Sequence, residues 1–316
     1  MVEMRESSKK EREEYYREEW SSNDLPDYVL HSLSLREFGF DHDGSGPSDR
    51  YNQFMTPEEL SDFLKDNAPY AVYSSVALYE RPSNRGRWLK SELAFDIDAK
   101  DLPYKRCDCT GPDVCELCLE DALTAAAEFG DVLDQDLGLE NISYVYSGRG
   151  FHIRVFDDSV MELDQAGRSQ IVEYVTGSVV PGDFSLSLGY SEVFRERVLR
   201  TFEEVGVEDL EDAGIGGKGA KKLVENKGEV MEWIENGDFE RIIKDLKGVG
   251  RKSYDKFLNF MTRLNAEYTD GKVTIDKKRI LRVPSSLHST VSRKCVEIND
   301  IDDFSFYQAV PNFLKG

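Results

Sequence analysis

The chain has 316 residues, of which 61 are acidic and 40 basic, so its formal net charge is −21 and its pI about 4.7. No apolar run reaches the roughly 18 residues of a membrane-spanning helix, and the charged N-terminus lacks the apolar core of a secretory signal, so we expect a cytoplasmic protein. Acidity alone argues against nucleic-acid binding, because phosphates require positive surface. Acidity spread along the whole chain also suits a salt-rich cytoplasm, which screens self-repulsion.

The N-terminal part alternates short helix and strand patterns. We expect a helix over residues 9–20 and a short strand over residues 35–40. A second helix is predicted over residues 57–65, because Thr56 is a good cap, a proline follows in the first turn, and Glu59 has the spacing of a capping box.

Residues 72–79 have strand character, and the next predicted strand covers residues 93–98. The basic residues between these strands are Arg81, Arg85, Arg87 and Lys90. Period-two alternation in the second strand turns the apolar side chains to one face and the carboxylates of Asp96 and Asp98 to the other. Acidic pairs at this spacing arise often by chance in so acidic a chain. An unpaired charge in an apolar strand is costly, however, so this pair favours binding of one or two hard cations.

Four of the five cysteines fall within twelve residues, at Cys107, Cys109, Cys115 and Cys118. Without a secretory signal, this spacing favours a zinc site over a disulfide framework. The last two open a predicted helix that continues to about residue 137, and four thiolates make a closed structural site with no open position for catalysis. The alternative is a set of reduced thiols without a metal. The fifth cysteine, Cys295, is predicted to lie in the core.

Residues 147–152, Ser-Gly-Arg-Gly-Phe-His, join two apolar-alternating runs over residues 142–146 and 151–155. This pattern predicts a hairpin. Its turn offers the Ser147 hydroxyl, the Arg149 guanidinium and two flexible glycines, a combination that suits a polyphosphate. The alternative is an ordinary hairpin with a polar outer face.

Residues 185–264 are charged, punctuated by glycine and helical in pattern. The segments 214–220 and 246–250 both resemble helix-hairpin-helix turns. Backbone amides of such turns can bind a DNA phosphate; the alternative is that both are plain helix caps.

Strand character returns at residues 273–275 and 279–283, followed by a polar loop that contains His288. The basic residues near this loop are Lys277, Lys278, Arg279, Arg282, Arg293 and Lys294. Each cluster of this kind is commonly just a solvated surface, but both basic clusters of the chain adjoin candidate site segments.

Taken in order, these motifs resemble the catalytic small subunit of the archaeal and eukaryotic type of DNA primase, in a halophilic archaeal form. The resemblance covers about residues 33–157 and 270–294. The segments that carry it are Arg36-Glu37-Phe38, Asp49-Arg50-Tyr51, Phe95-Asp96-Ile97-Asp98, residues 147–152 and residues 282–288. The cysteines lie where that family has its zinc knuckle. Relatives often have a histidine at the second zinc ligand, where this chain has Cys109, and features that the family has beyond the last motif are not seen before Gly316.

The resemblance implies roles for individual residues. Asp96 and Asp98 would bind catalytic Mg²⁺ or Mn²⁺, with Asp270 as the third carboxylate and Asp276 as its competitor for that role. The residues that would hold the incoming triphosphate are Ser147, Arg149, His152, Arg282 and His288. The residues that would help to bind the initiating nucleotide are Glu37, Arg50 and Tyr51.

The resemblance also implies a fold and partners. We expect a mixed α/β (α+β) catalytic core, formed by residues 1–184 and 265–316, with a zinc knuckle at residues 105–120. A central, largely antiparallel sheet would carry the aspartate strand and the hairpin side by side, and residues 185–264 would form a helical subdomain. The expected partners are single-stranded DNA template, nucleoside triphosphates and a large subunit with an iron–sulfur cluster.

The function so implied is synthesis of short RNA or DNA primers by two-metal nucleotidyl transfer. Two alternatives stay open. One is a primase-superfamily polymerase of end-joining repair, against which the cysteine knuckle argues. The other is a zinc-stabilised nucleic-acid-binding protein without catalysis.

Overall fold

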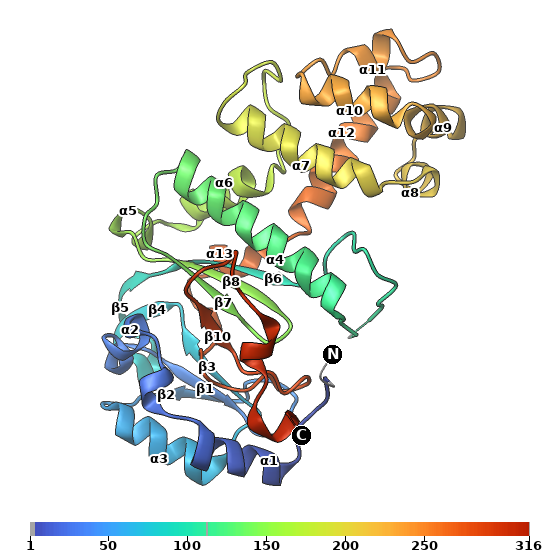
Figure 1. Cartoon of the computed structure of the whole chain (residues 1–316). Helices are drawn as coiled ribbons and strands as arrows, with labels where there is room; N and C mark the ends of the chain where they lie inside the picture. Colours follow the sequence, from blue (N-terminus) through green and yellow to red (C-terminus); the bar gives the residue numbers. More distant parts are fainter. Residues whose placement is uncertain (1–3, 112, 316) are drawn as a thin grey trace.

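The computed structural model describes residues 4–111 and 113–315, and it contains two four-stranded sheets, a two-stranded hairpin and a separate group of helices (Figure 1). We call the sheet with strand order β10-β7-β8-β6 the aspartate sheet. Its neighbouring strands all pair antiparallel. The strands are β6 (Leu93–Asp98), β7 (Ile142–Tyr146), β8 (Gly150–Val155) and β10 (Val296–Ile298). The expected antiparallel arrangement, with the aspartate strand beside the hairpin, is therefore confirmed.

One face of the aspartate sheet is covered by α4 (Glu116–Asp131), which a π-helical turn extends over Val132–Asp136. The ring of Phe95 on β6 meets that of Phe129 on α4 edge to face, with 6.2 Å between centroids. Apolar side chains that alternate along β6 and β8 fill this core. Burial of one face thereby fixes the orientation of the other, on which Asp96 and Asp98 lie.

The second sheet, which we call the N-terminal sheet, has the order β2-β1-β3-β9. Its strands are β1 (Phe38–Asp41), β2 (Asp49–Asn52), β3 (Ala71–Ser75) and β9 (Ile280–Arg282). The expected strand at residues 35–40 thus begins three residues later, after a 3₁₀ turn over Leu33–Leu35. The helices that accompany this sheet are α1 (Lys9–Glu14), continued by a π-helical turn (Tyr15–Glu19), α2 (Asp27–Leu30) and α3 (Pro57–Asn67).

Two local predictions in this region need correction. The single strand expected at residues 72–79 is divided at Val76. The Val76 amide donates to the carbonyl of Arg279, and the Val76 carbonyl accepts from the amide of Glu92. As a result, β3 and the strand that follows it pair in different sheets. That strand, β4 (Ala77–Arg81), forms a hairpin with β5 (Gly86–Ser91). Thr56 caps α3 as expected, but the Glu59 carboxylate accepts a hydrogen bond from the amide of Met55, not from that of Thr56.

The strand expected at residues 273–275 is also wrong, because the structure has a short helix, α13 (Gly271–Ile275), at this place. The Asp270 side chain accepts a hydrogen bond from the amide of Lys272 and so caps this helix. Local capping therefore overrides the β-branched composition of the segment. The other short helices that flank the aspartate sheet are α5 (Asp158–Met161) and α6 (Gln165–Thr176).

The remaining helices form a group with a hydrophobic core of its own, at the top of the view in Figure 1. They are α7 (Tyr190–Glu204), α8 (Val207–Asp212), α9 (Gly217–Glu225), α10 (Lys227–Glu235), α11 (Arg241–Lys244) and α12 (Arg251–Ala266). The expected helical character of residues 185–264 agrees with this. Within the described ranges, no helix has both the length and the apolar character needed to cross a membrane.

Candidate active site

The register of β6 and β8 sets the geometry of the candidate site. Asp96 lies opposite His152, and Asp98 lies opposite Gly150. The imidazole Nε2 of His152 is 3.5 Å from a carboxylate oxygen of Asp96. The two aspartates therefore share a face of the sheet with the turn that joins β7 to β8.

Asp270 lies next to Asp96, although 174 positions separate them in the chain. The amide of Asp270 donates to the carbonyl of Asp96 at 3.1 Å, and the hydroxyl of Thr269 donates to the same carbonyl at 2.8 Å. The competing residue, Asp276, lies at the far end of α13, where its carboxylate is 3.6 Å from Arg279. Of the two, Asp270 is the one bonded to the aspartate strand.

The charges of this cluster change the acidity of Asp96. Removal from water raises the pKa of its carboxyl to about 7, and the nearby carboxylates of Asp98 and Asp270 add to this effect, whereas the Arg282 guanidinium opposes it. Burial disfavours the charged form, and like charges this close are costly to ionise together. A divalent cation would offset this repulsion.

The carboxylate oxygens of Asp96, Asp98 and Asp270 do not all lie within 4.8 Å of one another. Among the described residues, only the cysteine cluster brings three or more metal-ligand groups within 4.8 Å of one another. One oxygen of Asp98 instead forms an ion pair with Arg149 at 2.8 Å, and its other oxygen accepts from the amide of Lys100 at 3.2 Å.

The turn from Ser147 to Gly150 depends on its two glycines. Gly148 has φ +103°, and a Cβ atom there would lie 2.5 Å from the Cβ of His288. A Cβ atom on Gly150 would lie 2.1 Å from the carbonyl oxygen of Ile97. The turn therefore packs tightly between the aspartate strand and the loop that carries His288, a fit that side chains would prevent.

Both site histidines are neutral near pH 7. Burial lowers the pKa of His152 well below its ordinary value, and the guanidiniums of Arg154 and Arg282 add to this effect. Burial likewise lowers the pKa of His288. The Nδ1 of His288 accepts a hydrogen bond from the amide of Thr290 at 3.2 Å, so the proton of the neutral ring lies on Nε2, where it can be donated to a ligand.

Arg282 connects the two sheets. From β9 of the N-terminal sheet, its guanidinium donates to the carbonyl of Ser147 at 3.2 Å and to the hydroxyl of Tyr73 at 3.1 Å. Arg282, Ser147, Arg149, His152 and His288 thus come together from separate parts of the chain; that they hold a triphosphate stays a prediction.

A second group forms around Glu37, which is fully buried. Its two carboxylate oxygens accept from Arg50 at 2.7 Å and from Arg85 at 2.6 Å. Tyr51 is largely exposed with φ +69°, and its ring centroid is 5.0 Å from the guanidinium carbon of Arg85. Both carboxylate oxygens of Glu37 are therefore occupied by arginine side chains.

Sequence reasoning did not single out Lys100 or assign a role to Arg85. The Lys100 ammonium is 3.9 Å from the Asp98 carboxylate, and its place two residues after the aspartate pair is a signal that could have found it. In the sequence, Arg85 could be recognised only as one of several basic residues between two predicted strands. Its contact with Glu37 spans 48 positions, which no local pattern encodes.

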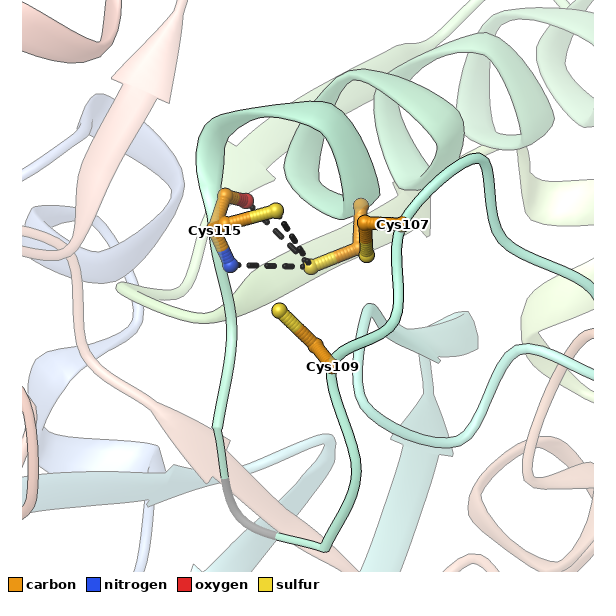
Figure 2. A group of neighbouring side chains, drawn as sticks. Cys107, Cys109 and Cys115 are labelled. Atoms are coloured by element: carbon orange, nitrogen blue, oxygen red, sulfur yellow. Dashed lines mark hydrogen bonds between the residues drawn. The ribbon is translucent and has the colours of Figure 1, made fainter.

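The four clustered cysteines meet at the start of α4, where their sulfur atoms all lie within 4.8 Å of one another. Figure 2 shows the side chains of Cys109 and Cys115 directed toward a common point beside the first turn of this helix. Although burial alone would raise it, the pKa of Cys115 falls to about 7, because the amide of Cys118 and the neighbouring thiols donate to its sulfur. Four thiolate donors in this arrangement are compatible with a structural zinc ion.

Comparison with known proteins agrees with this geometry. Residues 95–300 match the model of a family described as DNA primase small subunit. The chain is 41% identical to the DNA primase small subunit PriS of Methanobrevibacter smithii, over 97% of this chain and 97% of that protein. It is 42% identical to the proteins of the same name from Methanothermobacter thermautotrophicus, over 96% and 95% of the two chains, and from Pyrococcus abyssi, over 99% and 95%.

Proposed function

We propose a residue-level mechanism for this chain, which belongs to the DNA primase small-subunit family. It is the catalytic, primer-synthesising subunit of a DNA primase and hence a nucleotidyltransferase. Of the residue-level evidence, the hydrogen bond from the Asp270 amide to the Asp96 carbonyl supports the mechanism most directly, because it joins the third carboxylate to the aspartate strand. Primer synthesis on single-stranded DNA, assayed with and without Mn²⁺ at high salt, tests the function; no product with either Mg²⁺ or Mn²⁺ would contradict it.

We infer that Asp96, Asp98 and Asp270 hold Mg²⁺ or Mn²⁺. Carboxylate oxygens are the ligands that these ions prefer, and the raised pKa of Asp96 fits a site that needs a cation before all three carboxyls ionise. When bound there, such ions would supply activation of the 3′-hydroxyl of the growing primer and stabilisation of the leaving pyrophosphate. The ion pair between Asp98 and Arg149 would have to open for each side chain to bind its own ligand.

The triphosphate of the incoming nucleotide would take the place of that ion pair. Arg149 presents a planar guanidinium suited to a phosphate, and Arg282 adds a second one from the other sheet. Neutral His288 would donate its Nε2 proton to a phosphate oxygen, while His152 lies against Asp96 and would orient it. In the second group, Glu37 holds Arg50 and Arg85 beneath exposed Tyr51, which suits the phosphates and base of an initiating nucleotide.

Replacing Arg149 with alanine is expected to raise the KM for the nucleoside triphosphate about 10- to 100-fold, because a charge-assisted hydrogen bond contributes about 1.5–3 kcal/mol. Initial rates of primer synthesis against nucleotide concentration measure this. The control is Arg87→Ala, which removes a largely exposed guanidinium paired with Glu80 and should leave KM unchanged. An unchanged KM with a reduced kcat in Arg149→Ala would instead mean that Arg149 only positions Asp98.

We propose that the cysteine cluster holds one zinc ion that stabilises the residues before α4 and takes no part in chemistry. The variant Cys115→Ser is then expected to lower bound zinc well below one atom per chain and to lower the melting temperature, because structural zinc binding contributes directly to folding. Atomic absorption and thermal unfolding measure the two effects. Cys295→Ser, which changes a buried thiol outside the cluster, should keep its zinc. Equal zinc content in all three proteins would refute the assignment.

The domain limits and the cellular setting are also proposals. We infer a catalytic core of residues 1–184 and 265–316, with a helical subdomain at residues 185–264 that agrees with the separate core of α7–α12. A primase small subunit works with template DNA, nucleoside triphosphates and a large subunit; we propose that the large subunit carries an iron–sulfur cluster. The net charge of −21 suggests a cytoplasm rich in salt.

A further inference from the structure

The helical subdomain contains a sequence repeat for which the mechanism above has no use. Residues 214–223 read Gly-Ile-Gly-Gly-Lys-Gly-Ala-Lys-Lys-Leu, and residues 248–257 read Gly-Val-Gly-Arg-Lys-Ser-Tyr-Asp-Lys-Phe. Both fit the pattern glycine, branched aliphatic residue, glycine, any residue, lysine, and then a second lysine four positions later. The offset between the two copies is 34 residues.

The two copies have the same backbone structure. Each first glycine has positive φ, +80° at Gly214 and +110° at Gly248. The aliphatic residue that follows is buried in the subdomain core in both copies. Each second glycine, Gly216 or Gly250, is the N-cap of a helix, α9 or α12, and provides no capping side chain.

The fold brings the two hairpins into contact. A Cβ atom on Gly219 of the first copy would lie 3.4 Å from the carbonyl oxygen of Gly248 in the second, and the Lys218 side chain lies over the same Gly248. In return, the Lys256 ammonium of the second copy donates to the Gly214 carbonyl of the first. The hairpins therefore form one continuous surface, which we call the double-hairpin surface (residues 214–224 and 246–256).

The charge of this surface is opposite to that of the chain. These ranges carry seven basic residues and one acidic residue, whereas the whole chain has 40 and 61. Two carboxylates border the surface, Glu211 beside Gly217 and Glu225, which pairs with Lys222. The equivalent lysines Lys218 and Lys252 are exposed, and each lies in the first turn of its helix. A cation in the first turn is repelled by the helix dipole, so this arrangement costs stability unless an anion binds there.

From the paired hairpins and their charge, we propose that the double-hairpin surface binds the phosphate backbone of duplex DNA without reading its sequence. The two equivalent lysines and the adjacent starts of two helices match a polymer of regularly spaced phosphates. Single-stranded DNA is bound through exposed aromatic rings that stack on bases. On this surface the only aromatic residue is Tyr254, which is buried, so contact is limited to the backbone and favours a duplex. The inference rests on the proposed function only in that a primer-synthesising chain works on DNA.

The test is binding of a fluorescent 20-base-pair DNA duplex and of one of its single strands to the full-length chain, measured by anisotropy over a series of salt concentrations. In the variant K218Q/K252Q, duplex affinity at about 0.1 M salt is expected to fall at least tenfold. The negative slope of log affinity against log salt should become shallower by about 2, because two phosphate contacts are lost. Primer synthesis on a short single-stranded template should be unchanged.

The matched control is K9Q/K10Q, which removes two exposed lysines from α1, in the N-terminal part of the chain. It makes the same change in net charge and should keep both the affinity and the slope. Equal losses in the two variants, no loss in K218Q/K252Q, or a loss in K218Q/K252Q that is as large for the single strand as for the duplex would each overturn the proposal. DNA binding is measured separately from primer synthesis, so the two proposals can fail independently. If the wild-type chain makes no primer but K218Q/K252Q still lowers its duplex affinity, only the catalytic assignment is refuted.

Discussion

Replacing Asp96 with asparagine is expected to reduce primer synthesis by about 10³-fold or more while leaving the fold intact. Stabilisation of developing charge by a bound metal ion contributes several kcal/mol to the transition state, and about 4 kcal/mol corresponds to about 10³ in rate. Asparagine keeps the shape of the side chain but not its charge. Primer yield per folded molecule, measured with saturating nucleotide and Mn²⁺, gives the effect.

The same substitution is expected to act in the opposite direction on stability. Because the folded-state pKa of Asp96 is raised to about 7, the folded chain holds a proton that the unfolded chain releases near pH 4. The proton-linked stability is therefore complete below pH 4 and is lost as pH rises through 7. At pH 8 with EDTA, Asp96→Asn should melt no lower than the wild type, and we expect it to melt higher.

An aspartate outside the site provides the control for both effects. Asp62 is exposed on α3, and Asp62→Asn should change neither synthesis nor the pH dependence of melting. If Asp96→Asn retained more than a tenth of the wild-type rate, Asp96 would not be a metal ligand. Loss of activity caused only by unfolding would contradict the assignment equally.

Local patterns were sufficient for the aspartate strand, the hairpin beside it and the cysteine cluster. Alternation of apolar and polar residues identified β6, β7 and β8, because one buried face imposes a period of two on a strand. The cysteine spacing identified the cluster at the start of α4, and the short turn at residues 147–150 identified β7 and β8 as a hairpin. These features depend on residues that are close in sequence, so they can be predicted from the sequence alone.

Long-range contacts account for what was missed. Val76 ends a strand because its backbone bonds to Arg279 and Glu92, neither of which is recognisable from the residues around it. The β-branched residues after Asp270 indicated a strand, but the Asp270 cap and the bond to Asp96 make the segment a helix. The sequence left both Asp270 and Asp276 open as the third carboxylate, because both precede basic, strand-like sequence ahead of His288. That Asp270 lies beside the aspartate strand depends on a contact between distant segments.

The largest loss of stability is expected from a residue outside the candidate site, Glu92, which is fully buried immediately before β6. Its carboxylate pairs with Arg36, which precedes β1, and with Arg154 of β8 at 2.8 Å. Both guanidiniums are themselves buried. Glu92→Ala would leave two positive charges without their partner in the interior, and removing one partner of a buried ion pair costs about 3–5 kcal/mol.

Urea unfolding at neutral pH measures this loss, and the midpoint should fall while the slope of free energy against urea stays constant. The control is Glu120→Ala, because Glu120 pairs with Arg106 at 3.0 Å on the surface and exposed pairs contribute about 0–1 kcal/mol. Equal losses in the two variants would show that burial does not set the strength of the network. A selective loss would mean that this ion network joins β8 of the aspartate sheet to the segment leading into β1. Since β8 follows the 147–150 turn, the same network would hold the residues that we propose to bind nucleotide, on the two sheets, in their relative positions.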